Sequence, residues 1–284
     1  ILIGIFGKQP NGWLIIVSIF AIPLSIFGLI RFFFLPEDIR EKEFEKKEEE
    51  KNITVKESLK ALFSNKYIFM LGGAFMMRSV LVTLTSSTTN YYYTYVFGNV
   101  SAASIPSMVS ALGMFSVVLL STCCRKFGNR NTIIYGLIMA IAGFVLRYAA
   151  PTNIPVLCVA TLLSGVGVLP IGYLRSVMVI DTITYGKWKT GKEVEGVYAS
   201  VNGVVDKLGL GLGSVLVGLV LELGGYDGTL AVQPDTVIPA IKFMCNGLTT
   251  ILCVVAIVFL VMYDLEKKMP QIKRELAERE EAKA

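Results

Sequence analysis

Long runs of apolar residues are the strongest constraint that this sequence places on its fold. Each run is close to the roughly 20 residues that a helix needs to cross a bilayer. Because 54% of the chain is hydrophobic and gathered in these runs, the sequence predicts an all-α membrane protein. The predicted spans lie at about 13–35, 67–92, 105–123, 131–150, 154–180, 197–222 and 238–263.

Lysine and arginine alternate from one side of these spans to the other. Basic residues follow the first, third, fifth and last spans, whereas the loops YTYVFGNVSAAS, AAPTN and GGYDGTLAVQPDT contain none. Cytoplasmic loops carry such an excess of positive charge. We therefore expect an integral protein of the cell membrane with its basic loops and C-terminus in the cytoplasm and residues 1–12 outside.

The stretch 36–66 is the one large soluble segment, and its charges alternate in sign as in a solvated helix. The apolar spacing of Val55, Leu59, Leu62 and Phe63 predicts a short amphipathic helix on the membrane surface. A linker between two halves of a larger bundle fits this segment, and an ordinary loop without a regulatory role fits it too. The predicted parts are the end of an N-terminal half at 1–35, a linker at 36–66, a six-helix bundle at 67–263 and a cytoplasmic tail at 264–284.

Lys207 is a charged residue deep inside an apolar run, about 15 Å from its cytoplasmic end at 1.5 Å per residue. A charge there costs about 2.5–3.5 kcal/mol, so it needs a partner or a function. Asp206 is adjacent, but neighbours on a helix point about 100° apart and form no simple ion pair. Lys207 therefore needs a carboxylate from another helix, and Asp206 needs a cation or a proton. The chain has no other acid at this depth, so we expect the partner of Lys207 in a part of the protein outside this sequence.

Three arginines also lie within the predicted spans. Arg78 precedes a run of hydroxyl residues at 83–90, which favours a helix facing an aqueous cavity, although such residues also bond to their own backbone. Arg147 is close enough to the outer end of its span to reach the lipid headgroups. Arg175 can reach the cytoplasmic headgroups or face the cavity. Pro170 predicts a kink, for packing or for exposing backbone to a substrate.

Composition excludes several function classes. The chain has no histidine, and its five cysteines lack metal-ligand spacing, which argues against a metal site, a cofactor or an enzyme. The net charge of +5 follows from the basic loops and does not indicate nucleic-acid binding. Gly209 and Gly213 lie four apart and predict a close helix contact rather than a phosphate-binding loop. A seven-span receptor would fit the number of spans but would not need the charge of Lys207.

One long segment carries a family resemblance. VMVIDTITYGKWKTGKEVEGVYASVNGVVDKLG resembles the cytoplasmic loop and eleventh helix of the glycoside–pentoside–hexuronide:cation symporters, the branch of the major facilitator superfamily that includes the melibiose carriers. NYYYTYVFGN resembles the end of the seventh helix of that family, and NGWLIIVSIFAIPLSIFGLIRFFFLPED resembles its sixth. The chain would then be the last seven of twelve spans: the C-terminal six-helix half of a major facilitator fold plus one preceding helix.

The resemblance implies a secondary transporter that imports sugar together with Na⁺, Li⁺ or H⁺ by alternating access. A major facilitator carrier of a lipid or another non-sugar solute is the alternative. The implied partners are the sugar, membrane lipid and the absent N-terminal half. Two departures from the family pattern are Thr184, in place of a second acid, and Gly203, in place of a hydroxyl residue. Asp206, where that branch has an apolar residue, could carry a proton or change the ion choice.

Two sets of residues are candidates for the transport machinery. The expected substrate and cation site contains Lys207, Asp206, Asn202, Arg78, Tyr173 and Arg175. The expected cytoplasmic gating loop contains Asp181, Tyr185, Gly186, Trp188, Lys187, Lys189 and Lys192. Asp181 and the three lysines are expected to bridge to the other half of the carrier when the inner gate closes.

Overall fold

The computed structural model describes residues 11–34, 60, 62–191, 195–230 and 232–281. It divides the chain into two units, 1–54 and 55–284. The first unit contains helix α2 (Gly12–Phe34), which coincides with the first predicted span. Its side chains are largely exposed and apolar. The predicted amphipathic helix lies mostly outside the described residues, as does most of the linker.

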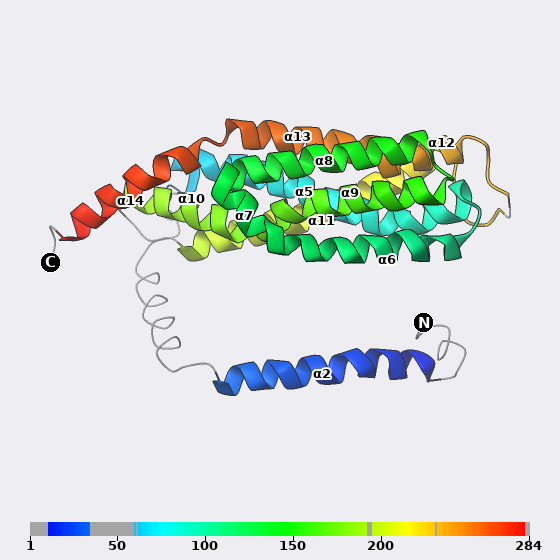
Figure 1. The fold of residues 1–284 in the computed structure, drawn as a ribbon, viewed down its shortest axis with the longest axis horizontal. Coiled ribbons are helices and arrows are strands. Elements are labelled where there is room, and N and C mark those ends of the chain that lie inside the picture. Colours follow the sequence, from blue (N-terminus) through cyan, green and yellow to red (C-terminus); the bar gives the residue numbers. More distant parts are fainter. Residues whose placement is uncertain (1–10, 35–59, 61, 192–194, 231, 282–284) are drawn as a thin grey trace. The chain divides into compact units, whose positions relative to one another are not determined.

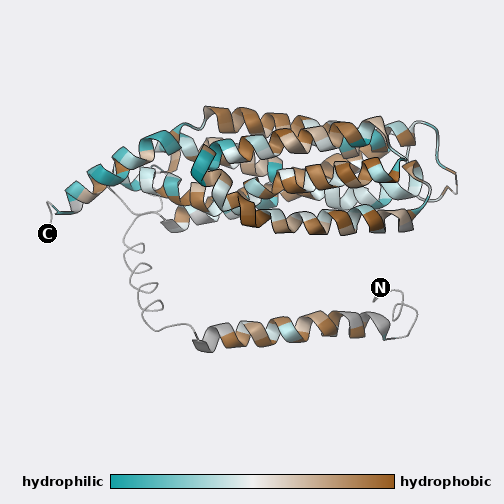
Figure 2. Ribbon diagram, viewed as in Figure 1, coloured by the Kyte–Doolittle hydropathy of each residue, from teal (hydrophilic) through white to brown (hydrophobic). Residues whose placement is uncertain are grey.

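The second unit is an all-helical bundle (Figure 1). Six of its helical segments are long and apolar enough to cross a membrane, while the apolar part of α2, Val17–Ile30, is shorter. The apolar residues follow the lengths of these helices, and the hydrophilic ones gather at their ends and on the last helix (Figure 2). These findings confirm the predicted fold class, including the six spans of a C-terminal half.

The bundle starts with α5 (Lys66–Tyr91), which the π-helical turn η1 (Tyr92–Val96) extends. The next span is made of α6 (Ser104–Leu112), η3 (Gly113–Ser116) and α7 (Val117–Phe127), after a short turn η2 (Val100–Ala103). The remaining elements are α8 (Asn129–Ala149), α9 (Ile154–Tyr173), α10 (Arg175–Thr190), α11 (Glu195–Leu223), α12 (Val237–Lys242), η4 (Phe243–Leu248), α13 (Thr249–Met262) and α14 (Leu265–Glu281).

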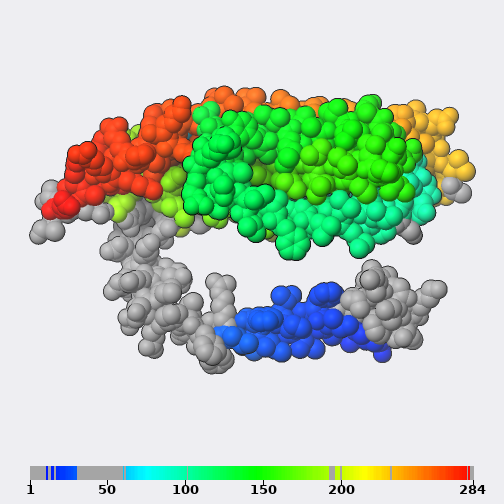
Figure 3. Space-filling model, viewed as in Figure 1, coloured from blue at the N-terminus to red at the C-terminus, as the bar shows by residue number. Residues whose placement is uncertain are grey.

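Helix α5 is the centre of this unit and packs against α11 and α13. In Figure 3 the side chains of α6 to α9 cover it on the visible face. Glycines allow the close approach of α11: a Cβ at Gly209 would lie 2.6 Å from Cβ of Ser79, and one at Gly213 would lie 2.6 Å from Cβ of Thr83. The predicted packing role of these two glycines is confirmed.

The segment predicted as a cytoplasmic loop is largely helical. Residues 181–190 continue α10, which ends at Gly191 in a left-handed conformation (φ 68°). Glycine adopts that conformation without strain, so it stops the helix there. The loop prediction was wrong because the segment contains no proline, and its one glycine, Gly186, is buried within the helix. Arg175 consequently lies 15 residues from the end of α10.

Pro170 lies inside α9, where it supplies no backbone donor. The kink expected at this residue stays a prediction. Pro170 is buried, and α9 ends three residues later at Tyr173, with a break at Leu174 before α10 begins. This break places Arg175 at the first position of a new helix. A helix that restarts inside the bundle can direct its first side chains towards a neighbouring span.

Candidate functional site

A group of polar side chains joins three helices at the middle of the bundle. An Arg175 Nη1 donates to Asp206 Oδ2 at 2.5 Å, and Ser79 Oγ donates to the other oxygen, Asp206 Oδ1, at 2.6 Å. Arg175 Nη2 donates to the backbone oxygen of Asn202 at 3.1 Å. We call Ser79, Arg175, Asn202 and Asp206 the charge cluster. It ties α5 and α10 to α11, and both oxygens of its carboxylate have a partner.

The local structure explains how Arg175 reaches this position. Its guanidinium carbon lies 5.0 Å from the ring centre of Phe75, which holds the side chain through a cation–π contact. Of the two ion-pair side chains, Arg175 is 17% exposed and Asp206 is 35% exposed. Pairing therefore leaves the carboxylate partly accessible. The sequence left open whether Arg175 reaches the headgroups or faces the cavity, and the structure directs it to Asp206.

Arg78 lies beside the cluster without joining it. Its Nε is buried and has no hydrogen-bond partner among the described residues. Gly172 makes room for its guanidinium, since a Cβ there would lie 3.0 Å from Arg78 Nη2. The charges of Arg175 and Asp206 act on it through space. Arg78 therefore places a second positive charge beside the cluster. Within the described chain, its Nε donates no hydrogen bond.

Lys207 is exposed on α11, next to Asp206 but pointing away from it. No residue within the described ranges forms an ion pair or hydrogen bond with it. The expectation that its carboxylate partner comes from elsewhere stays a prediction. Asp206, which needed a cation or a proton, obtains a cation from Arg175.

The other two site candidates differ in their connection to the cluster. The amide oxygen of Asn202 lies 3.4 Å from Arg175 Nη2, and its amide nitrogen donates to the backbone of Tyr198 at 3.3 Å. Tyr173 is half exposed, and the described chain offers it no hydrogen bond. The structure thus places Asn202 in the cluster and leaves Tyr173 beside it.

Six of the seven gating candidates lie on the last three turns of α10, and two of them, Asp181 and Trp188, contact α14. Trp188 Nε1 donates to Glu275 Oε2 at 2.7 Å, and Arg279 Nη1 donates to the backbone oxygen of Trp188 at 2.9 Å. Lys273 Nζ lies 3.9 Å from Asp181 Oδ1. In this structure, therefore, the tail helix supplies partners for Asp181 and Trp188.

Three further gating candidates lie against the start of α5 or α11. Tyr185 packs edge-on against Tyr67 with ring centres 4.8 Å apart, and Gly186 contacts the Tyr198 hydroxyl. Lys189 Nζ donates to the backbone oxygen of Ser64 at 2.5 Å. Lys187 also takes part in an interaction, and Lys192 lies outside the described residues.

The prediction for Arg147 was wrong. Its Nε donates to Asn246 Oδ1 and its Nη2 to the backbone oxygen of Cys245, both at 2.5 Å. The guanidinium also lies over the rings of Tyr92 and Phe144 at 5.4 and 5.6 Å. It points into the bundle, where these acceptors and rings hold it. Asn246 was the available signal: a polar residue in the predicted last span requires a partner.

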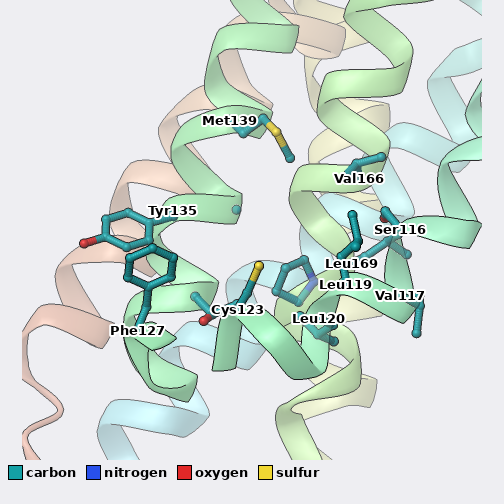
Figure 4. A pocket seen from close by; sticks show the side chains of 13 residues that line it. Ser116, Val117, Leu119, Leu120, Cys123, Phe127, Tyr135, Met139, Val166 and Leu169 are labelled. Carbon is teal, nitrogen blue, oxygen red and sulfur yellow. The ribbon is translucent and has the colours of Figure 1, made fainter. Parts of the chain in front are cut away.

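An apolar cavity of about 260 Å³ lies between α7, α8 and α9. Figure 4 shows Cys123, Met139 and Val166 among the side chains around it. Its hydroxyl groups are few, and that of Thr132 already donates to the backbone of Gly128. A sugar needs many polar contacts in its site, so this cavity does not suit a hydrophilic substrate.

Comparison with known proteins decides the family. The model for MFS/sugar transport protein matches residues 1–267. This chain belongs to that family. Its members carry solutes and are not enzymes, which confirms the class predicted from the sequence. With six membrane-length helices, the chain is an integral membrane protein.

The relatives are distant. The isoprimeverose transporter of Lactiplantibacillus pentosus is 25% identical, over 98% of this chain and 58% of its own length. The raffinose carrier protein of Pediococcus pentosaceus is 24% identical, over 76% and 33%. A putative 2,3-dihydroxypropane-1-sulfonate exporter of Escherichia coli is 25% identical, over 93% and 57%. The chain spans less than two thirds of the length of these relatives.

Proposed function

We propose that this chain is part of a sugar:cation symporter that imports its substrate by alternating access. The carrier would be completed by helices beyond those of this sequence, with the substrate between the two halves near the middle of the membrane. The observation that supports this most is the charge cluster. It holds the carboxylate of Asp206 at mid-depth between two helices, next to the exposed Lys207.

Each member of the site has a proposed role. The coupling cation, Na⁺, Li⁺ or H⁺, competes with positively charged side chains for carboxylates near the membrane centre. Asp206 is one such carboxylate and Arg175 its competitor. Lys207 pairs with an acid of the other half, and the arriving cation releases it. Releasing a charged side chain changes which helices attract each other, and this couples ion binding to the movement of the halves.

The end of α10 is proposed as the inner gate. Asp181 and the lysines at 187, 189 and 192 would bridge to the other half when the cytoplasmic side closes. The contacts of Asp181 and Trp188 with α14 offer these side chains a second set of partners. A gate with two alternative sets of contacts can have two positions of similar free energy.

The test is transport by the full-length carrier in sealed vesicles. Isoprimeverose and raffinose are the first substrates to try, given the names of two of the relatives. An imposed inward Na⁺ or H⁺ gradient should drive accumulation of one of them. Uptake that no cation gradient changes would contradict symport while leaving sugar transport intact.

Two other outcomes have specific support. The relative named as a sulfonate exporter favours a test of the outward direction and of a solute that is not a sugar. A carrier of lipid or another solute remains the alternative to a sugar carrier. Failure of all sugars, with transport of a sulfonate or a lipid, would replace the proposal.

A further inference from the structure

A polar chamber of about 240 Å³ lies between α5, α6, α8 and α9, closed at one side by η4. Its wall carries hydroxyl groups and one arginine. The residues that line it include Thr88, Tyr93, Ser107, Ser110, Arg147 and Thr161. Thr88 is nine residues from Ser79 on α5, so the chamber is about 13 Å from the charge cluster along that helix. It lies towards the end of the bundle away from α14.

The charge in this chamber comes from Arg147. Its two hydrogen bonds go to neutral oxygens, those of Asn246 and Cys245. Within the described part of the chain no carboxylate forms an ion pair with it. Neutral acceptors satisfy the donors of a guanidinium but leave its charge uncompensated. A half-buried charge of this kind attracts an anion, because the surroundings screen it less than water would.

The hydroxyl groups complete a binding surface. Thr88 and Thr161 donate to backbone oxygens of their own helices at 2.6 Å, so their oxygens can accept a hydrogen bond. Tyr93, Ser107 and Ser110 donate to no group of the described chain, so their protons are available to a ligand. One water occupies about 30 Å³ of liquid, so the chamber has room for a ligand the size of roughly eight waters.

We infer that this chamber is a binding site for a small polyhydroxylated anion, such as a sugar acid. The carboxylate or sulfonate lies on Arg147, and the hydroxyls of the ligand bond to the serines, the threonines and Tyr93. The inference rests on the proposed sugar transport and names the class of sugar. The chamber is an additional position for the substrate, separate from the site around Asp206 and Lys207.

The experiment measures access and charge at one engineered thiol. Ser107, which is exposed and lines the chamber, is changed to cysteine after the five native cysteines are replaced. Two methanethiosulfonate reagents, one anionic and one cationic, are compared for their rate of reaction. The anionic reagent should react faster, on the order of tenfold, and D-glucuronate should slow both while D-glucose at the same concentration does not.

Variants then assign the effect to Arg147. Arg147→Gln should abolish both the preference for the anionic reagent and the protection by glucuronate, and Arg147→Lys should retain part of each. Ser110→Asp places a negative charge in the chamber without touching the two bonds of Arg147, and should reverse the preference. If Arg147→Gln does not fold, Ser110→Asp still tests whether charge in the chamber sets the preference. Arg125→Gln removes an exposed charge far from the chamber and should change nothing.

The outcomes separate the two proposals. Equal protection by glucose and glucuronate would overturn the anionic class, and no protection by either would overturn the site. A preference that survives both Arg147→Gln and Ser110→Asp would overturn the role of Arg147. None of these measurements requires transport, so the symport proposal stands or falls on the vesicle experiment alone.

Discussion

The charge cluster and the polar chamber each hold an arginine inside the same helix bundle, but they compensate its charge differently. Arg175 faces the carboxylate of Asp206, whereas Arg147 faces the neutral oxygens of Asn246 and Cys245. In the first case both charges are paired within the chain. In the second case Arg147 has hydrogen-bond acceptors, but no negative charge compensates its positive charge. The paired group joins helices, and we propose that it also switches partners, whereas the uncompensated charge is proposed to attract a ligand.

Lys207→Ala should have the largest effect and tests whether the exposed lysine belongs with the paired charges. Removing one partner of a buried ion pair costs about 3–5 kcal/mol, which corresponds to an effect on a rate of roughly 100-fold or more. We expect accumulation of substrate against a gradient to fall by about that factor in the full-length carrier. Exchange of sugar without a gradient should fall much less.

The control for this variant is the amount of folded protein in the membrane, which should stay near that of the wild type. Near-normal accumulation by Lys207→Ala would mean that Lys207 has a packing role only. The charge cluster would then act without Lys207.

Asp206→Asn breaks the paired cluster directly. It leaves Arg175 without its carboxylate, and the loss of a hydrogen bond between charged groups costs about 2 kcal/mol. Thermal unfolding in detergent should therefore occur at a lower temperature. Adding Arg175→Gln should restore part of the loss, because no unpaired charge remains in the double variant. Additive losses in the double variant would show that the two side chains do not stabilise the fold as a pair.

Gly213→Val tests how far the cluster depends on the close approach of α5 and α11. A Cβ at Gly213 would clash with Thr83, and overpacking of this kind costs about 1–3 kcal/mol. Gly218→Ala on the same helix is the matched control, since a Cβ there meets no atom within 4 Å. The control should be neutral or slightly stabilising. Equal unfolding temperatures for both variants would contradict the packing role.

Asp181→Asn should have the smallest effect and addresses a charge outside both regions. Asp181 lies 3.9 Å from Lys273, at the end of the bundle rather than at mid-depth. Transport by the full-length carrier should slow a few-fold, with the apparent affinity for sugar within about twofold, as for a surface ion pair worth about 0–1 kcal/mol. A complete loss of sugar binding would argue against gating.

Much of the fold followed from sequence because the membrane restricts it. Apolar runs of sufficient length must become helices in lipid, so four of the predicted spans match the observed segments within about four residues at both ends, and two others start as predicted but continue beyond the predicted end. The segment at 181–190 was mistaken for a loop because polar composition alone does not break a helix. Arg147 was assigned to the headgroups because its position along the predicted span does not show towards which side of the helix its side chain points.

The sequence by itself determined the fold class, most of the helix positions, the family resemblance and the place of Lys207 and Asp206 along their helix. These depend on composition and on distances along one helix. Tertiary structure alone decided that Asp206 pairs with Arg175 and Ser79, that Arg147 turns inward to Asn246, and that α14 contacts α10. The physical reason is that a charge in a low-dielectric interior pairs with whichever polar group of a neighbouring helix lies within hydrogen-bond distance. The rotation of each helix about its axis fixes that geometry, and only packing sets the rotation.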